Sequence, residues 1–170
     1  PREDVSNAIK MCKKAGIDVK IITGDNPLTA AEIGNEIGIN DGKLEQEQLI
    51  TSDEYNSLEE TELIQRTLKL KVLARAKPAD KMTMVNILKK NGHVVAMTGD
   101  GTNDAPAMNT SDCGIAMGLS GTATAKEASD LILMDDSFSS IVTGVLWGRT
   151  IYLNIQKFRT LCRGHFQYLQ

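Results

Sequence analysis

The spacing of hydrophobic residues alternates between the helical period of about 3.6 residues and the short apolar runs of buried strands. Residues 3–15 follow the helical period, and Gly16 ends it. The apolar face of this helix consists of Val5, Ala8, Ile9, Cys12 and Ala15. Residues 18–22 form a short apolar segment that is typical of a buried strand. Pro27 suits a first helical turn, so we expect residues 27–37 to form the next helix.

Residues 40–70 are more polar and less regular, and we interpret them as a peripheral excursion with two short helices, one after Ser52 and one over 58–68. The alternation then resumes. We expect strands at 71–74, 93–98, 113–117 and 131–134, a small helix between the last two strands, and longer helices at 78–90 and from about 139. The continuous apolar run 94–96 predicts that its strand is central and covered on both faces.

Short strands separated by helices predict an α/β fold with a doubly wound, mostly parallel sheet and a long C-terminal helix. In such sheets, ligands bind at the loops that follow the carboxyl ends of strands. This rule selects the loops after residues 22 and 97, together with the region around Lys81.

Composition narrows the function classes. The net charge of the 170 residues is −3 and aromatic residues make up 4%, whereas nucleic-acid binders carry a basic surface and stacking side chains. The three cysteines have neither a disulfide framework nor metal-ligand spacing. No apolar run approaches the roughly 20 residues that a membrane helix needs. We therefore expect no nucleic-acid partner.

The loop 98–106, Thr-Gly-Asp-Gly-Thr-Asn-Asp-Ala-Pro, follows a predicted strand. Its glycines allow close backbone approach, and Asp100 and Asp104 offer hard oxygen ligands for a divalent cation. The simpler alternative is an Asp/Gly turn. A turn requires neither both carboxylates nor Asn103, so the sequence favours a divalent-cation site.

Thr23-Gly24-Asp25-Asn26 follows the other strand and precedes a helix. A hydroxyl and free backbone amides at this point can bind phosphate. An Asx-type turn with Asn26 as the helix cap explains the same residues equally well. Lys81 lies in the first turn of a helix, the unfavourable end of the dipole for a cation. It is either a solvated charge or a group that neutralises an anion, and taken alone the solvated charge is favoured.

Together these features resemble the haloacid-dehalogenase superfamily, and the motifs are most similar to those of P-type ATPases. Thr23-Gly24-Asp25, Lys81 and residues 98–106 are similar to three motifs of that family's phosphorylation domain. Residues 121–136 and 147–158 are similar to the run from that domain into its stalk helix. The resemblance covers residues 2–158. It implies that residues 1–138 are the C-terminal part of the phosphorylation domain and that 139–170 are a stalk helix with a tail.

The resemblance implies a role for each matching residue in the loop 98–106. Asp100 would be the Mg²⁺ ligand beside the phosphoryl group. Asn103 and Asp104 would organise the phosphate site, Asp104 partly by orienting Lys81, and Lys81 would neutralise charge during transfer. These roles agree with phosphoryl transfer as a reaction of positioning and charge stabilisation.

In the other loops, the resemblance implies that Thr23 and Gly24 hold phosphoryl oxygens and that Thr23, Lys81 and Asp104 are the catalytic residues. Asp25 and Arg75 would approach the nucleotide or its metal. Mg²⁺ is the implied cofactor and ATP the implied substrate of the parent protein.

The sequence departs from the family in one important respect, because it contains no Asp-Lys-Thr-Gly-Thr, the motif that carries the phosphorylated aspartate. We therefore expect the chain to be part of a longer protein and to be inactive alone. The strand of the absent motif would lie centrally, so unpaired sheet edges could lead to self-association. After Phe158, Arg159, Arg163, Gly164 and His165 stand where the family continues into a hydrophobic membrane helix, and the origin of this tail is open.

Residues 142–158 look most like calcium pumps of the plasma-membrane type, which implies a cytosolic domain of a membrane protein whose partners are the nucleotide-binding and transmembrane domains. Two alternatives remain. A soluble phosphatase of the same superfamily would need an early aspartate nucleophile, and neither Asp4 nor Asp18 has a suitable context. A noncatalytic interaction module would leave the retained residues Lys81, Asp100, Asn103 and Asp104 unexplained.

Overall fold

Two parallel sheets of three strands each organise the molecule in the computed structural model, which describes residues 3–40 and 42–166. The first has the order β1-β3-β2, with β1 (Ile21–Ile22), β3 (Val72–Ala74) and β2 (Leu49–Thr51). The second has the order β4-β5-β6, with β4 (Ala96–Gly99), β5 (Cys113–Met117) and β6 (Leu131–Leu133). The predicted parallel α/β fold is confirmed, and its division into two sheets is an addition that the sequence pattern did not reveal.

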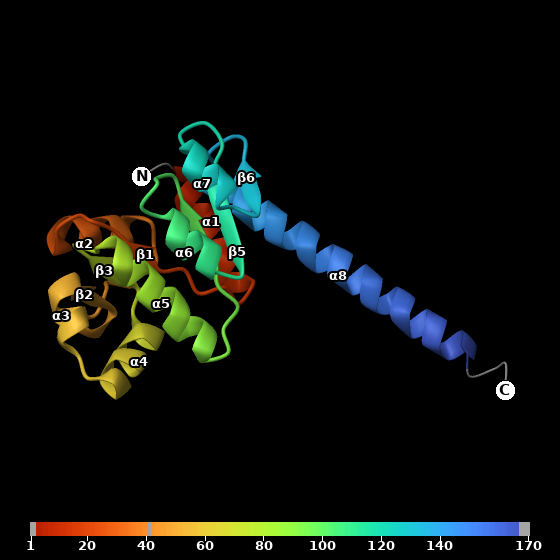
Figure 1. Ribbon diagram of the computed structural model, residues 1–170, viewed down its shortest axis with the longest axis horizontal. Coiled ribbons are helices and arrows are strands. Elements are labelled where there is room, and N and C mark those ends of the chain that lie inside the picture. Colours follow the sequence, from red (N-terminus) through yellow and green to blue (C-terminus); the bar gives the residue numbers. More distant parts are fainter. Residues whose placement is uncertain (1–2, 41, 167–170) are drawn as a thin grey trace.

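Helices connect and flank these strands (Figure 1). They are α1 (Glu3–Lys14), α2 (Pro27–Glu36), the 3-10 turn η1 (Gln46–Gln48), α3 (Ser52–Ser57), α4 (Glu60–Lys69), α5 (Pro78–Lys90), α6 (Ala105–Thr110), α7 (Ala123–Glu127) and α8 (Phe138–Phe166). Helix α2 illustrates how local sequence sets the ends. The Asn26 side chain accepts a hydrogen bond from the Thr29 amide at 3.0 Å, Pro27 begins the helix, and Gly38 follows it with φ of +70°.

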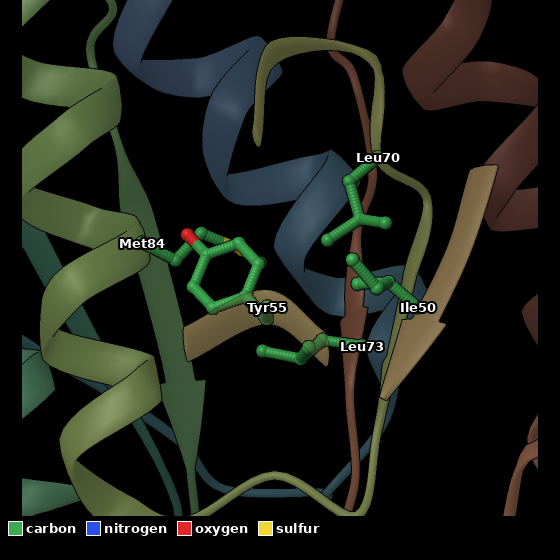
Figure 2. Close-up of a cluster of buried hydrophobic side chains, with 5 residues drawn as sticks. All are labelled: Ile50, Tyr55, Leu70, Leu73 and Met84. Atoms are coloured by element: carbon green, nitrogen blue, oxygen red, sulfur yellow. The ribbon is translucent and has the colours of Figure 1, made fainter. Parts of the chain in front are cut away.

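The core of the first sheet depends on the segment 40–70. Figure 2 shows Ile50 of β2, Tyr55 of α3, Leu70, Leu73 of β3 and Met84 of α5 packed together, and all five are buried. The Tyr55 hydroxyl is fully buried in a hydrogen bond of 2.7 Å with the hydroxyl of Thr67. Interpreting residues 40–70 as peripheral was therefore wrong. This segment supplies an edge strand and the largest fully buried side chain of the core.

The strand predicted at 93–98 lies further along the chain, at Ala96–Gly99, and is not covered on both faces. Ala96 is exposed, and Val94 just before the strand is 89% exposed. Among the described residues, β4 pairs with β5 alone, so its other edge lacks a neighbouring strand. The apolar run 94–96 predicted a strand buried on both faces, and the exposure of Val94 and Ala96 shows that this prediction was wrong.

Helix α8 projects away from the two sheets (Figure 1). Its base is held against α1, because Val142 is buried in a cluster with Ala8 and Cys12, and Arg149 donates to the Ala15 carbonyl at 2.8 Å. From residue 150 to 161 every side chain is exposed. The helix passes through Phe158 without a break, while residues 167–170 of the predicted tail lie outside the described residues. In the described part of the chain, no helix combines the length and apolar character that crossing a membrane requires.

Candidate functional site

The loop after β4 folds tightly around Asp104, the residue just before α6. The Asp104 amide donates to the Gly101 carbonyl at 3.1 Å, and the Gly101 amide lies 3.4 Å from Asp104 Oδ2. A Cβ added to Gly99 would lie 2.4 Å from Asp104 Cβ, which is closer than any real contact. The Asp104 side chain therefore lies directly against the glycine backbone, and only 7% of the residue is exposed.

Lys81 reaches this loop from the first turn of α5 and forms an ion pair with Asp104. The two side chains are 19% and 10% exposed, so the pair is mostly shielded from water. A carboxylate at this position offsets the unfavourable placement of an ammonium group near a helix N-terminus. The structure thus brings together two of the expected site residues, and Lys81 is not the solvated charge that the simpler alternative proposed.

The loop after β1 is organised by its own side chains. The Thr23 hydroxyl donates to Asp25 Oδ2 at 2.9 Å and accepts from the Asp25 amide at 3.1 Å. Gly24 between them is exposed, and no atom beyond its two chain neighbours lies within 4 Å of where its Cβ would be. The helix cap predicted for Asn26 is confirmed. The open backbone at Gly24 is compatible with bound phosphate, which stays a prediction.

Arg75 connects this loop to the end of β3. The Arg75 amide donates to the Asp25 carbonyl at 2.8 Å, and the Ala76 amide donates to the Thr23 carbonyl at 2.9 Å. Arg75 adopts a φ of +52°, a left-handed conformation that is uncommon for a residue with a side chain. The two residues expected near the nucleotide, Asp25 and Arg75, are therefore neighbours through their backbones, and both side chains are exposed.

The site residues form two groups, one on each sheet. Thr23, Gly24, Asp25 and Arg75 belong to the first sheet, whereas the loop 98–104 belongs to the second. Within residues 3–40 and 42–166, no hydrogen bond or ion pair joins these two loops directly. Helix α5 links the groups, because it follows β3 and its Lys81 pairs with Asp104.

A second lysine fixes α5 along α6. Lys89, in the last turn of α5, donates to the Thr110 carbonyl at 2.6 Å and pairs with Asp112 at 3.1 Å. Because Asp104 precedes α6 and Thr110 ends it, the two lysines hold both ends of that helix.

Asp136 is a residue whose contribution sequence reasoning missed. Its carboxylate accepts from the amides of Leu119 at 2.9 Å and Ser120 at 2.7 Å, and the Leu119 amide above all holds the pKa of Asp136 below its usual value. At the end of the same loop, the Thr122 amide donates to the Asp100 carbonyl at 2.8 Å. The loop after β5 thus connects Asp136 to the backbone of the candidate metal ligand.

Asp80 is a second missed residue. It is 2% exposed, and its carboxylate accepts from the Ser52 hydroxyl at 2.7 Å, the Asn56 side chain at 2.8 Å and the Lys77 amide at 2.7 Å. Burial acts to raise the pKa of Asp80, but these hydrogen bonds outweigh it and hold that pKa below its usual value. The only signal in the sequence is an acidic residue in a first helical turn, which does not reveal partners more than 20 residues away.

The loop after β4 provides only part of a magnesium site. Asp100 is exposed, while the Asp104 carboxylate is occupied by Lys81. Across the described residues, no group of three or more histidine, cysteine or carboxylate side chains is arranged to hold a metal. Mg²⁺ commonly binds through one or two carboxylates, with water and substrate phosphate as the other ligands. Asp100 can serve as one such carboxylate.

The profile of the haloacid dehalogenase-like hydrolase family matches residues 1–112, so the chain belongs to this family. Over 92% of its length it is 47% identical to calcium-transporting ATPase 12, plasma membrane-type, of Arabidopsis thaliana, and equally to calcium-transporting ATPase 7, plasma membrane-type, of Oryza sativa subsp. japonica. The chain spans about 15% of the length of these relatives.

A crystal structure of a zinc-transporting PIB-type ATPase in the E2.Pi state matches 92% of this chain and 20% of its own chain, with a TM-score of 0.69 and 32% identity. The chain is therefore homologous to one segment of P-type ATPases, the segment whose motifs resemble the phosphorylation domain.

Proposed function

We propose that this chain supplies the magnesium, phosphate and lysine parts of the aspartyl-phosphate site in an ATP-driven calcium pump. The observation that carries the proposal is the shielded ion pair between Lys81 and Asp104, beside Asp100 in the loop after β4. The similarity to plasma-membrane-type calcium ATPases supports calcium as the transported ion. The phosphorylated aspartate, the nucleotide-binding domain and the membrane helices would come from the rest of the pump, and this chain would lie on its cytosolic side.

In this proposal each group of residues has a separate task. Thr23, Gly24 and Asn103 bind phosphoryl oxygens, and Lys81, held by Asp104, neutralises the charge that develops on the transferred group. Asp25 and Arg75 lie toward the nucleotide. Asp100 would hold Mg²⁺, which supplies charge neutralisation at the phosphoryl oxygens when bound. Without the nucleophile the isolated chain is inactive.

Mg²⁺ binding to the isolated chain tests the placement of the metal ligand. We expect weak binding by calorimetric titration, because the site is partial, and we expect that binding to be lost in Asp100→Asn. The matched control is Asp53→Asn, because Asp53 is an exposed carboxylate of α3 in a surface ion pair with Lys77. Tight wild-type binding would show that the site is not the partial one described, and equal loss in both variants would show that Asp100 is not the ligand.

Phosphorylation of the full-length protein tests the function itself. In membranes that contain the complete polypeptide, we expect radioactive phosphate from ATP to be incorporated only when calcium is present. Lys81→Met should reduce the rate of phosphorylation by roughly 10²–10³-fold, the usual cost of removing one preorganised charge donor. Calcium-independent labelling, or no labelled intermediate in the wild type, would reject the proposal of a calcium pump.

A further inference from the structure

The first turn of α5 is attached to α3 through the buried carboxylate of Asp80. Two of its three hydrogen-bond donors, the Ser52 hydroxyl and the Asn56 amide, belong to α3, and the third is the Lys77 amide at the start of α5. A carboxylate that is 2% exposed cannot exchange these partners for water without a large change in its surroundings. Asp80 therefore connects one short helix to the beginning of another.

Helix α3 is itself held firmly enough to act as an anchor. The Tyr55 ring lies in the core next to Met84 of α5 (Figure 2). At the start of the helix, Thr51 and Glu54 form a capping box, with the Thr51 amide donating to Glu54 Oε2 at 3.0 Å. Both the apolar face and the N-terminus of α3 are thus fixed, so its polar side chains present Asp80 with donors in defined positions.

Lys81 is the residue directly after Asp80, and its ammonium group pairs with Asp104, the residue just before α6. The first amides of a helix have no partner within the helix, so first turns fray unless other groups satisfy them. Asp80 satisfies the Lys77 amide and simultaneously joins the turn to α3. The exposed ion pair between Lys77 and Asp53 joins the same two helices, but surface pairs of this kind contribute little.

We infer that Ser52, Asn56 and Asp80 form a positioning network that places Lys81 against Asp104. None of the three touches a reacting group in this assignment, since they act through the first turn of α5. The inference deepens the proposed function and rests on it for the role of Lys81. It also gives the segment 40–70 a task in the site, because α3 supplies two members of the network.

The ion pair can be observed directly in the 170-residue chain by nitrogen–proton NMR of lysine ammonium groups at low temperature. An ammonium group that is protected from water and held in an ion pair exchanges its protons slowly and gives a signal. The signal that is lost in Lys81→Arg is thereby assigned to Lys81. We expect this signal to disappear when Ser52→Ala and Asn56→Ala are combined. If the double variant does not fold, Asn56→Ala alone should weaken the signal, because Asn56 is an exposed residue and its truncation leaves the core intact.

Tyr55→Phe is the matched control. It removes a buried hydroxyl from the same helix and breaks the hydrogen bond to Thr67, but it leaves the ring against Met84 and keeps all three hydrogen bonds of Asp80. The Lys81 signal should persist in this variant even though its thermal midpoint falls. A Lys81 signal that persists in both network variants, or that is lost equally in Tyr55→Phe, would overturn the inference.

The outcome is independent of the pump assay, because the NMR signal is read without ATP or calcium. Loss of the signal in the network variants together with the absence of a calcium-dependent phosphoenzyme would reject the proposed function and retain the positioning of Lys81. An unchanged signal in the network variants together with a normal calcium-dependent phosphoenzyme would retain the proposed function and reject the positioning network.

Discussion

Replacing Gly99 with alanine tests whether the Asp104 side chain occupies the position described for it. The added methyl group would lie 2.4 Å from Asp104 Cβ and 2.9 Å from both Cγ and Oδ2. These contacts cannot be relieved by a flexible chain end, because the nearest atom is attached directly to the Asp104 backbone. Forcing an extra methyl into such a site costs about 1–3 kcal/mol in the free energy of unfolding.

Gly24→Ala provides the comparison. Gly24 lies two residues after the end of β1, has no positive φ, and has no atom beyond its two chain neighbours within 4 Å of its Cβ position. Alanine in such a place stabilises a protein by about 0.4–1 kcal/mol, because the unfolded chain loses conformational freedom. The two substitutions, identical in chemistry, should therefore shift stability in opposite directions and differ by about 1.5–4 kcal/mol.

Urea unfolding followed by circular dichroism measures this difference, and thermal unfolding checks it at about 2–4 °C per kcal/mol for a chain of this size. The Lys81 ammonium signal should be lost in Gly99→Ala, because Asp104 has to move, and retained in Gly24→Ala. Equal stability of the two variants would refute the packing of Asp104 on Gly99. A retained Lys81 signal in a destabilised Gly99→Ala would show that the ion pair does not depend on this packing.

Two further predictions concern pH and association. The pKa of Asp80 is lowered in the folded state, so its carboxylate stabilises the fold above the unfolded pKa of about 3.9, and this contribution is lost as the pH falls through the folded value. The stability deficit of Asp80→Asn should therefore be full at pH 7 and shrink in acid, and a deficit independent of pH between 2 and 7 would contradict this assignment. The unpaired edge of β4 and the exposed Val94 beside it should cause concentration-dependent association in sedimentation. Val94→Lys should reduce it, and a wild-type mass that is monomeric at every concentration would refute the prediction.

Local signals predicted the elements whose ends are set by local chemistry. The helix expected at 78–90 is found as Pro78–Lys90, because a proline suits its first turn and Gly92 follows its end with φ of +82°. The strand expected at 113–117 is found unchanged as Cys113–Met117. The strand at 93–98 was misplaced because its burial depends on neighbours that local sequence does not reveal.

The candidate site divides in the same way. Motif spacing indicated the two loops and Lys81. The resemblance placed Asp104 beside this lysine, and the two form an ion pair, while the role of Asp104 in orienting Lys81 stays a prediction. The support of the site could not be predicted, because it depends on contacts between residues distant in sequence. Asp80 accepts hydrogen bonds from Ser52 and Asn56, which lie 28 and 24 positions away in the sequence, and Asp136 accepts one from the Leu119 amide, 17 positions away.

Strand β2 was not predicted from the sequence, because its three residues are too few to display an alternating pattern.

The shape of α8 has a mechanical consequence. Its 29 residues extend about 43 Å at 1.5 Å per residue, and its packing against α1 is confined to the first three turns. A rotation of about 5° at the base would therefore displace the far end of the described helix by nearly 4 Å, given that length. Asp135 accepts a hydrogen bond from the Ser137 amide at the base, next to the Asp136 that fixes the loop bonded to Asp100. A movement of Asp100 would therefore reach the base of α8 through the loop after β5, which bonds to Asp100 at Thr122 and to Asp136 at Leu119 and Ser120.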